Sequence, residues 1–421
     1  MENFLQSPRK MLNTSQLFRM PWTDSDNAFS WLEITHRCDL NCDYCYQTND
    51  PHSDKTILEV KKDLEILMGL RCCDTMFVSG GEPLLHPRLE EIIELVRSHK
   101  VKPVLVTNGQ ALTAAIVKRL KKAGLFGFIL HIDRGQSRPG WIDKTEKELN
   151  SLRQHYADMI YAEKGLICGF NTTILPETIH EVKDVVSWTV RNIHKVCTNT
   201  LIPVRVIRED DPWTFYVQGK RIPFKDIAFS TKKYKNPTEM HLTAQDIFDQ
   251  VCKVMPTFKT NAFLGGTEIS NAPKWVFSNI LGTPQKLYGQ LGPKAMEVLQ
   301  NGHHLFVNRF LSFLTPGCYA RGKLLFLLSM VDRELRKALL SYLTGSLRNP
   351  LLLFRKLFVQ SLLILQPQDI LPNGEQDLCN GCPNKTAHEE RLVPMCRKEE
   401  YLRFGDRVTL KARQIANQET I

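Results

Sequence analysis

Short apolar runs alternate with helical periodicity between residues 30 and 210. The runs rich in β-branched or aromatic residues predict six strands: SWLEIT, TMFVS, PVLVT, GFILHI, LICGFNTTI and LIPVRV. Between them, apolar residues at helical spacing predict helices in ILEVKKDLEILMGL, RLEEIIELVRSHK, AAIVKRLKKAG and ETIHEVKDVVSWTVRNI. Strands and helices that alternate in this way are typical of repeated βα units on a parallel sheet. The pattern therefore predicts an α/β fold, and its order is consistent with a barrel.

The pattern changes after residue 210. Residues 211–300 are rich in Pro, Gly and aromatic residues, which predicts an irregular bridge that could cover an open barrel. Two strongly apolar segments follow, KLLFLLSMVDRELRKALLSYL and NPLLLFRKLFVQSLLILQP, and both are predicted to be helical, the second with Pro350 in its first turn. The second segment is too short and interrupted to predict a membrane span, so core packing is favoured over an interfacial or lipid-contacting helix.

Composition excludes a disordered chain and favours anionic partners. The 421 residues are 43% hydrophobic, which is ordinary for a globular protein, and the net charge of +10 is spread without a long basic block. We therefore expect no nucleic-acid partner, although peripheral membrane contact stays open. The first twenty residues contain no continuous apolar run, which predicts a soluble, cytoplasmic protein.

Three cysteines, Cys38, Cys42 and Cys45, lie close together directly after the first predicted strand. A closed zinc site or a fully ligated iron-sulfur cluster needs four protein ligands, whereas a catalytic metal site keeps one position open. The loop therefore predicts either an open coordination position or a distant fourth ligand from the nine other cysteines. In a reducing cytosol, such cysteines are ligands or core residues rather than disulfides.

Two further polar turns follow the second and third predicted strands. GGEP follows TMFVS, and TNG follows PVLVT. Because ligands bind at the carboxyl ends of parallel strands, these turns and the cysteine loop should meet at one rim of the sheet.

The sequence CDLNCDYC resembles the C-x3-C-x2-C loop of the radical S-adenosylmethionine (SAM) superfamily, and GGEP one βα unit later strengthens the resemblance. The resemblance covers residues 30 to about 210 and implies a partial (β/α)6 TIM-like barrel. It implies a 4Fe-4S cluster held by Cys38, Cys42 and Cys45, with SAM itself chelating the fourth iron. It also implies reductive cleavage of SAM to a 5′-deoxyadenosyl radical that abstracts a substrate hydrogen, with an electron from a low-potential donor such as flavodoxin or ferredoxin.

The resemblance also assigns cofactor contacts to single positions. The glycines of GGEP would allow close approach of the backbone to SAM, and the Glu82 carboxylate would accept from its amino group. Local turn or strand contacts are the alternatives for the TNG turn and for residues 171–173. The positions that would contact SAM are Tyr44, Gly80, Gly81, Glu82, Pro83, Thr107, Asn108, Asp133 and Asn171.

A second cysteine group near the C-terminus has the pattern C-x2-C-x13-C, formed by Cys379, Cys382 and Cys396. It resembles the auxiliary-cluster regions of the SPASM or Twitch type, in which Cys318 would complete four ligands of a second 4Fe-4S cluster. Two alternatives stay open: a three-cysteine cluster like that of the GTP cyclase of molybdenum cofactor biosynthesis, and a zinc site.

These observations predict the following organisation: a partial (β/α)6 barrel and a mostly helical, cysteine-containing auxiliary domain at the C-terminus. The predicted parts are an N-terminal extension (1–29), the barrel (30–210), a bridging, substrate-covering region (211–317), an auxiliary-cluster region with a helical insertion (318–405) and a tail (406–421). The expected function is radical SAM chemistry on a peptide, an apolar lipid or isoprenoid, or a phosphorylated small molecule. The alternatives are the GTP cyclase and a zinc-stapled module that is not an enzyme.

Overall fold

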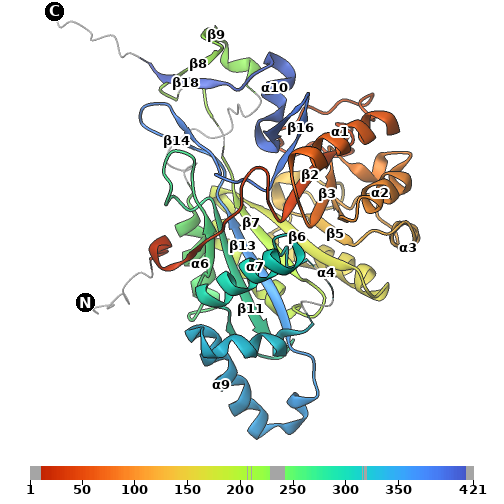
Figure 1. Ribbon diagram of the computed structural model, residues 1–421. Helices are drawn as coiled ribbons and strands as arrows, with labels where there is room; N and C mark the ends of the chain where they lie inside the picture. The colour runs from red at the N-terminus through yellow and green to blue at the C-terminus, as the bar shows by residue number, and fades with distance from the viewer. Residues whose placement is uncertain are drawn as a thin grey trace, which may run out of the picture.

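The computed structural model describes residues 11–205, 207–209, 211–227, 242–314, 316 and 320–413. One sheet of eleven strands dominates it, in the order β1-β10-β11-β13-β7-β6-β5-β4-β3-β2 with β12 beside β11 (Figure 1). Smaller sheets join β14 to β15, β16 to β17, and β8 to β9 and β18.

Six parallel strands in chain order form the predicted barrel half: β2 (Phe29–Glu33), β3 (Thr75–Ser79), β4 (Lys102–Thr107), β5 (Gly127–His131), β6 (Ile167–Ile174) and β7 (Thr198–Pro203). The helices between them are α1 (Ile57–Leu70), α2 (Leu89–Ser98), α3 (Ala114–Lys122), α4 (Glu146–Ala162) and α5 (Val182–Arg191). The buried stripes of α1 to α4, such as Val60, Leu64 and Leu67 of α1, pack into one core with the sheet, and α5 packs mainly into a second core. The predicted α/β fold with a partial barrel is confirmed.

The sheet continues beyond β7 with strands from later in the chain: β1 (Phe18–Arg19), β10 (Ala262–Leu264), β11 (Trp275–Gly282), β12 (Leu287–Gln290) and β13 (Phe358–Leu365). β13 is parallel to β7 and antiparallel to β11. Aromatic rings connect β2, at one end of the sheet, with β11, two strands from the other end, because Trp22 contacts both Phe29 and Phe277 at centroid distances of 5.6 and 5.5 Å. The strands therefore curve around a common interior.

The predicted helix in NPLLLFRKLFVQSLLILQP, residues 349–367, is wrong. The short 3-10 helix η8 (Pro350–Leu353) is followed by β13, which lies in the middle of the sheet. A strand covered on both faces is apolar at nearly every position, so its sequence lacks the alternation that marks a half-exposed strand. Leu362 and Ile364 are each only 1% exposed.

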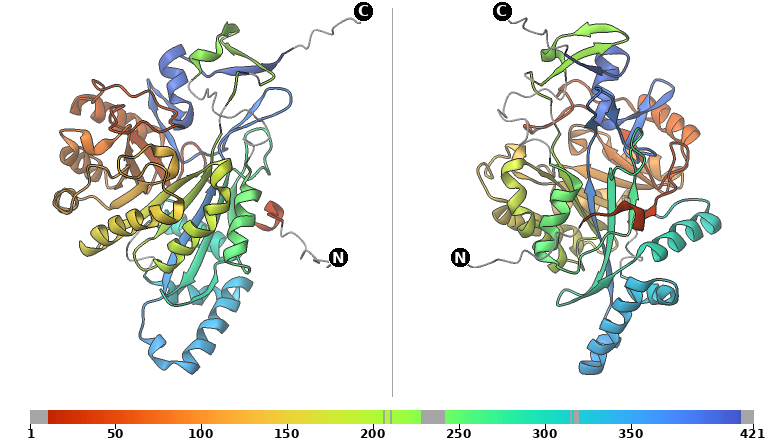
Figure 2. Two further views of the ribbon diagram at one scale, coloured as in Figure 1. Left: turned by 180° about the vertical axis from the view of Figure 1, so that it is seen from behind. Right: turned by 90° about the vertical axis from the view of Figure 1, so that its left-hand side faces the viewer.

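The remaining elements surround this sheet (Figures 1 and 2). They are η1 (Thr14–Gln16), η2 (Pro83–Leu85), η3 (Arg134–Gln136), η4 (Pro176–Glu181), β8 (Trp213–Val217), β9 (Lys220–Ile222), η5 (Phe224–Asp226), α6 (Ala244–Val254), α7 (Pro293–Val307), η7 (Gly322–Met330), α9 (Arg333–Arg348), β14 (Asp369–Ile370), β15 (Gln376–Asp377), β16 (Lys385–His388), β17 (Arg391–Pro394), η9 (Met395–Arg397), α10 (Lys398–Phe404) and β18 (Thr409–Ala412). Residues 211–300 thus contain more regular structure than their composition predicts. No helix in the described part of the chain is long and apolar enough to cross a membrane.

Candidate active site

The cysteine loop runs from the end of β2 to the start of α1. Thr56 caps α1, because its side chain accepts a hydrogen bond from the backbone N–H of Glu59 and the Glu59 carboxylate accepts one from Thr56 in return. The first residues of the loop pair with the GGEP turn: the N–H of Gly81 donates to Thr35 O (2.8 Å), and that of Glu82 donates to Arg37 O (2.7 Å). The two motifs therefore lie against one another at the carboxyl ends of β2 and β3.

The two backbones can pair this closely because Gly80 and Gly81 have no side chains. Gly80 has φ +153°, and a Cβ there would lie 2.1 Å from Thr35 O. A Cβ on Gly81 would lie 2.5 Å from Arg37 O. Any side chain would displace the start of the cysteine loop. In the structure, the backbone that packs closely against these glycines is that of the chain's own cysteine loop.

Glu82 joins the GGEP turn to the TNG turn. Its fully buried carboxylate accepts hydrogen bonds from Thr107 Oγ1 (2.6 Å), the N–H of Asn108 (2.7 Å) and the N–H of Leu84 (2.9 Å). Burial raises the pKa of Glu82 to about 7, although these hydrogen bonds act in the opposite direction. A cationic group at this rim would favour the ionised form. The predicted contact with the SAM amino group stays a prediction.

Asn108 connects the TNG turn to the cysteine loop. Its side-chain Nδ2 donates to Asp39 Oδ1 (2.7 Å) and lies 3.9 Å from Cys38 Sγ. The backbone oxygen of Asn108 accepts a hydrogen bond from Arg138 (2.6 Å), which is only 4% exposed. Arg138 was not among the predicted site residues, because an isolated arginine after β5 carries no motif.

The segment after β5 closes the same rim around Asp133. Its carboxylate accepts from the N–H groups of Gly135 (2.9 Å) and Thr173 (3.0 Å), and it lies 2.8 Å from His131 Nε2. Burial acts to raise the pKa of Asp133, but His131 and these hydrogen bonds outweigh it, so the pKa is lowered. Tyr44 packs beside Gly135, where an added Cβ would lie 3.2 Å from its ring.

The three loop cysteines interact electrostatically with one another. Burial raises the pKa of Cys38 to about 11 and raises that of Cys42, which the charge of Asp133 raises further. Cys42 also interacts electrostatically with both other thiols. Among the described residues, no three Cys, His, Asp or Glu side chains gather closely enough to hold a single metal ion. The fit to a cluster therefore rests on the donor set: three thiols in one rim loop, clamped by backbone pairing and open to solvent at Cys45.

The second cysteine group also assembles, apart from Cys318, which lies outside the described residues. Cys379 and Cys382 are hydrogen bonded to each other, and Cys396 interacts electrostatically with both. Fully buried Arg71 holds this region on the barrel, because it donates to the backbone oxygens of Cys382 (3.1 Å) and Pro383 (3.2 Å). The four-cysteine 4Fe-4S cluster stays a prediction for this group, as do the two alternatives, a three-cysteine cluster and a zinc site.

Buried Tyr46 interacts with both cysteine groups. It interacts electrostatically with Cys45 of the first group and with Cys382 and Cys396 of the second, and burial raises its pKa. Tyr46 was not among the predicted site residues, although it directly follows Cys45. Both cysteine groups are therefore within electrostatic range of the Tyr46 hydroxyl.

A buried ion pair joins the barrel to the C-terminal region at the same place. The Glu33 carboxylate, at the end of β2, is paired with Lys398 at the start of α10 and lies 2.7 Å from both His36 Nε2 and Gln47 Nε2. Burial acts to raise the pKa of Glu33, but His36 and Lys398 lower it to about 2. The Glu33 carboxylate is therefore ionised at neutral pH.

Comparison with known proteins identifies a family that matches the part of the chain carrying this rim. Residues 32–189 match the family described as the Radical SAM superfamily. This chain carries a radical SAM domain. The match covers β2 to α5, which includes the cysteine loop and both rim turns.

The relatives of the radical SAM domain have different names. A probable GTP 3′,8-cyclase of Methanococcus maripaludis is 36% identical over 101 residues, which are 22% of this chain and 32% of the relative. An AdoMet-dependent heme synthase of Methanosarcina barkeri is 28% identical over 38% of this chain and 46% of its own length. The subtilosin biosynthesis protein AlbA of Bacillus subtilis is 29% identical over 30% of each chain. The matched part thus spans about a third to a half of these relatives.

Solved structures resemble the chain more distantly. Streptococcus suis SuiB bound to precursor peptide SuiA gives a TM-score of 0.34 at 16% identity, over 42% of this chain and 39% of SuiB. The structure of anSMEcpe with bound AdoMet gives 0.39 at 16% identity, over 55% of this chain and 59% of that protein.

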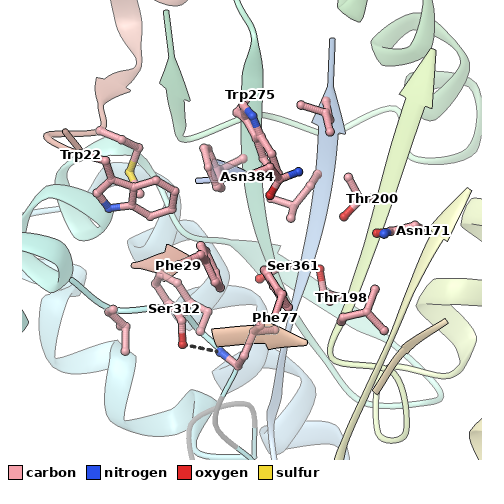
Figure 3. Close-up of a pocket in the computed structure, with 18 of the residues that line it drawn as sticks. Trp22, Phe29, Phe77, Asn171, Thr198, Thr200, Trp275, Ser312, Ser361 and Asn384 are labelled. Atoms are coloured by element: carbon pink, nitrogen blue, oxygen red, sulfur yellow. Dashed lines mark hydrogen bonds between the residues drawn. The ribbon is translucent and has the colours of Figure 1, made fainter. Parts of the chain in front are cut away.

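An apolar pocket fills the interior of the barrel beneath the radical SAM rim (Figure 3). Its volume is about 800 Å³, part of which is open to solvent. None of the described residues that line it is charged. Its aromatic wall consists of Trp22, Phe29, Trp31, Phe77, Trp275, Phe277 and Phe313.

A band of polar side chains crosses this pocket. It includes Asn171, which was predicted to contact SAM and which lines the barrel interior from β6. Several polar atoms of lining residues are buried without a hydrogen-bond partner in the structure. They are the indole nitrogens of Trp22, Trp31 and Trp275, the hydroxyl of Thr198 and Oδ1 of Asn384. A bound molecule with oxygen acceptors would relieve the cost of leaving the indole N–H groups and the Thr198 hydroxyl unpaired, whereas Asn384 Oδ1 would need a donor.

Proposed function

We propose that this chain is a radical SAM enzyme that removes a hydrogen atom from an apolar substrate held in the barrel. The observation that carries the proposal is the placement of the three loop cysteines, at a rim closed by the GGEP and TNG turns, above an uncharged aromatic pocket. When bound, the 4Fe-4S cluster and SAM supply an electron that cleaves the sulfonium and a 5′-deoxyadenosyl radical that abstracts the hydrogen.

The chain's own residues bind and orient these groups. Cys38, Cys42 and Cys45 would hold the cluster as thiolates, whose cost of burial the bound iron offsets. Gly80 and Gly81 let the start of the cysteine loop pack against the GGEP turn, and Glu82 keeps the neighbouring turn fixed. The uncharged, largely apolar lining of the pocket would shield much of a bound substrate from water.

The pocket favours a lipid or isoprenoid chain over the other substrate classes. A nucleoside triphosphate or another phosphorylated compound needs cationic partners, and none of the described lining residues is charged. This disfavours the GTP cyclase alternative, although a relative has that name. A peptide with apolar side chains is the second candidate, because another relative is named for bacteriocin biosynthesis.

The second cysteine group is proposed to bind an auxiliary 4Fe-4S cluster through Cys379, Cys382 and Cys396, with Cys318 as the fourth ligand. Its support is the buried thiol set next to Tyr46 and the radical SAM cysteines. We propose a flavodoxin or ferredoxin as the electron donor.

The central test is formation of 5′-deoxyadenosine. Anaerobic, reconstituted protein given dithionite and SAM should form it, and the Cys38→Ala, Cys42→Ala, Cys45→Ala triple variant should not, because the cluster loses its anchor. Cys72→Ala, at a half-buried cysteine outside both groups, is the matched control and should keep activity. Product from the triple variant would refute the proposal.

Iron analysis tests the auxiliary cluster separately. Wild type should hold about eight irons, and the triple variant about half of them, because two clusters contain four irons each. Zinc in place of the retained iron would assign the second group to a structural metal site.

A further inference from the structure

After α7, the chain leading to β13 forms a helical lobe, here called the α9 lobe and defined as residues 321–356. It contains η7, α9 and η8, and the three views of Figures 1 and 2 show it projecting from one end of the molecule. β13 starts directly after the lobe and runs parallel to β7. The lobe therefore lies at the amino ends of these strands, away from the rim that carries the cysteine loop.

One face of the α9 lobe is anchored in the protein. Leu335, Ala338 and Tyr342 of α9 are buried in a core with Leu281 and Tyr288 of the β11–β12 hairpin. The Tyr342 hydroxyl donates to Leu352 O (2.7 Å), and Arg336 donates to Met330 O (2.8 Å). The three helical segments are thus held together as one unit.

The opposite face of the lobe is apolar and exposed. Leu324, Leu327 and Met330 recur every third residue, which places them in a row on a 3-10 helix. Leu340, Leu343 and Leu347 form a comparable row on α9 at spacings of three and four. Ten large apolar side chains of the lobe are 44% to 86% exposed: Leu324, Leu327, Met330, Val331, Leu340, Leu343, Leu347, Leu351, Leu353 and Phe354.

The α9 lobe is also strongly basic. It contains eight Lys or Arg and two acidic residues, so its net charge of +6 is more than half of the +10 of the whole chain. Both acidic side chains are engaged. Buried Asp332 accepts from the N–H groups of Gly292 and Ala295, and Glu334 is paired with Lys259 and Lys337. The outward surface is therefore apolar and cationic together.

We infer that the α9 lobe docks this protein onto an anionic lipid bilayer, with its apolar rows in the interface and its cations at the phosphates. Exposed apolar side chains flanked by Lys and Arg are the composition that binds such a surface. A second copy of the chain fits less well, because a symmetric contact would place +6 against +6. Docking in this way leaves the cysteine rim facing away from the bilayer and accessible to an electron donor.

Vesicle flotation of the reconstituted enzyme tests the inference. Wild type should float with vesicles of phosphatidylcholine containing 30% phosphatidylglycerol, and float less with phosphatidylcholine alone or in high salt. The double variant Leu347→Ser, Phe354→Ser should bind at least tenfold more weakly. Each of Arg348→Glu and Lys356→Glu should weaken binding about fivefold or more.

Matched variants elsewhere on the surface test whether any loss of an exposed apolar side chain or a positive charge weakens vesicle binding. Leu58→Ser on α1, where the side chain is 79% exposed, and Lys118→Glu on α3 should float like wild type. Every variant should retain 5′-deoxyadenosine formation in detergent-free solution, so failure of the docking inference is distinguishable from failure of the proposed function. The inference is overturned if wild type stays in the soluble fraction, if the controls lose binding equally, or if light scattering shows a dimer that Phe354→Ser dissociates.

Discussion

Removing the charge of Glu33 tests whether its buried ion pair with Lys398 fastens the C-terminal cysteine region to the barrel. Glu33 is fully buried at the end of β2, and Lys398 starts α10, directly after the segment that carries Cys396. Glu33→Gln keeps the shape of the side chain and leaves Lys398 without its carboxylate partner.

The lowered pKa of Glu33 sets the magnitude. A fall from 4.5 to about 2 corresponds to about 3 kcal/mol, since one pKa unit is about 1.4 kcal/mol. Because the folded pKa is below the unfolded one, this contribution is fully present above about pH 4.5 and is lost as the pH falls toward 2. Burial lowers the pKa of Lys398, so the complete pair stabilises the fold by less than this figure.

The assay is urea unfolding of the reconstituted enzyme, followed by pulse proteolysis under anaerobic conditions. Glu33→Gln should lose about 3 kcal/mol, and the loss should be nearly constant between pH 8 and pH 5. Lys398→Met in the same chain should recover part of it, because no unpaired buried charge remains. Glu91→Gln, at an exposed pair with Arg88, should change stability by about 0.5 kcal/mol or less. A Glu33→Gln variant as stable as wild type would refute the reasoning.

Two further predictions concern the contacts that fix the cysteine groups. Gly81→Ala should abolish SAM binding measured by equilibrium dialysis, because its Cβ would displace the loop backbone, whereas Gly69→Ala on α1, with nothing within 4 Å of the added Cβ, should bind SAM normally. Arg71→Leu should cost about 3 kcal/mol and lower the iron content by about half, because the Cys382 segment loses its buried donor. Arg88→Leu on the surface should keep its iron, and equal losses in both Arg variants would contradict the assigned role.

The barrel half could be predicted because each of its units repeats one pattern. The predicted helix over residues 57–70 matches α1 in both bounds, and the strand over residues 75–79 matches β3. β7 begins three residues before its predicted start at 201, because Thr198, Asn199 and Thr200 read as a polar loop. In the structure Asn199 is buried and donates to the Thr189 hydroxyl (2.7 Å).

The missed features depend on partners distant in sequence. Helix α4 was overlooked because its buried face contains Glu146 and Arg153, which form an internal ion pair that a count of apolar positions cannot detect. The rim motifs were recognisable because each follows a strand directly. By contrast, Glu33 and Lys398 are more than 350 residues apart, so only the folded chain shows that they meet.

The position of β13 has a consequence for how the chain folds during synthesis. Its partner β7 is complete at Pro203, but residues 358–365 leave the ribosome roughly 160 residues later. At common elongation rates this interval is on the order of ten seconds or more. Until then the β7 edge of the nascent barrel has unpaired backbone N–H and C=O groups, which is the condition that promotes intermolecular strand pairing. Expression yield should therefore depend on chaperones that cover this edge while the second half of the sheet is still being translated.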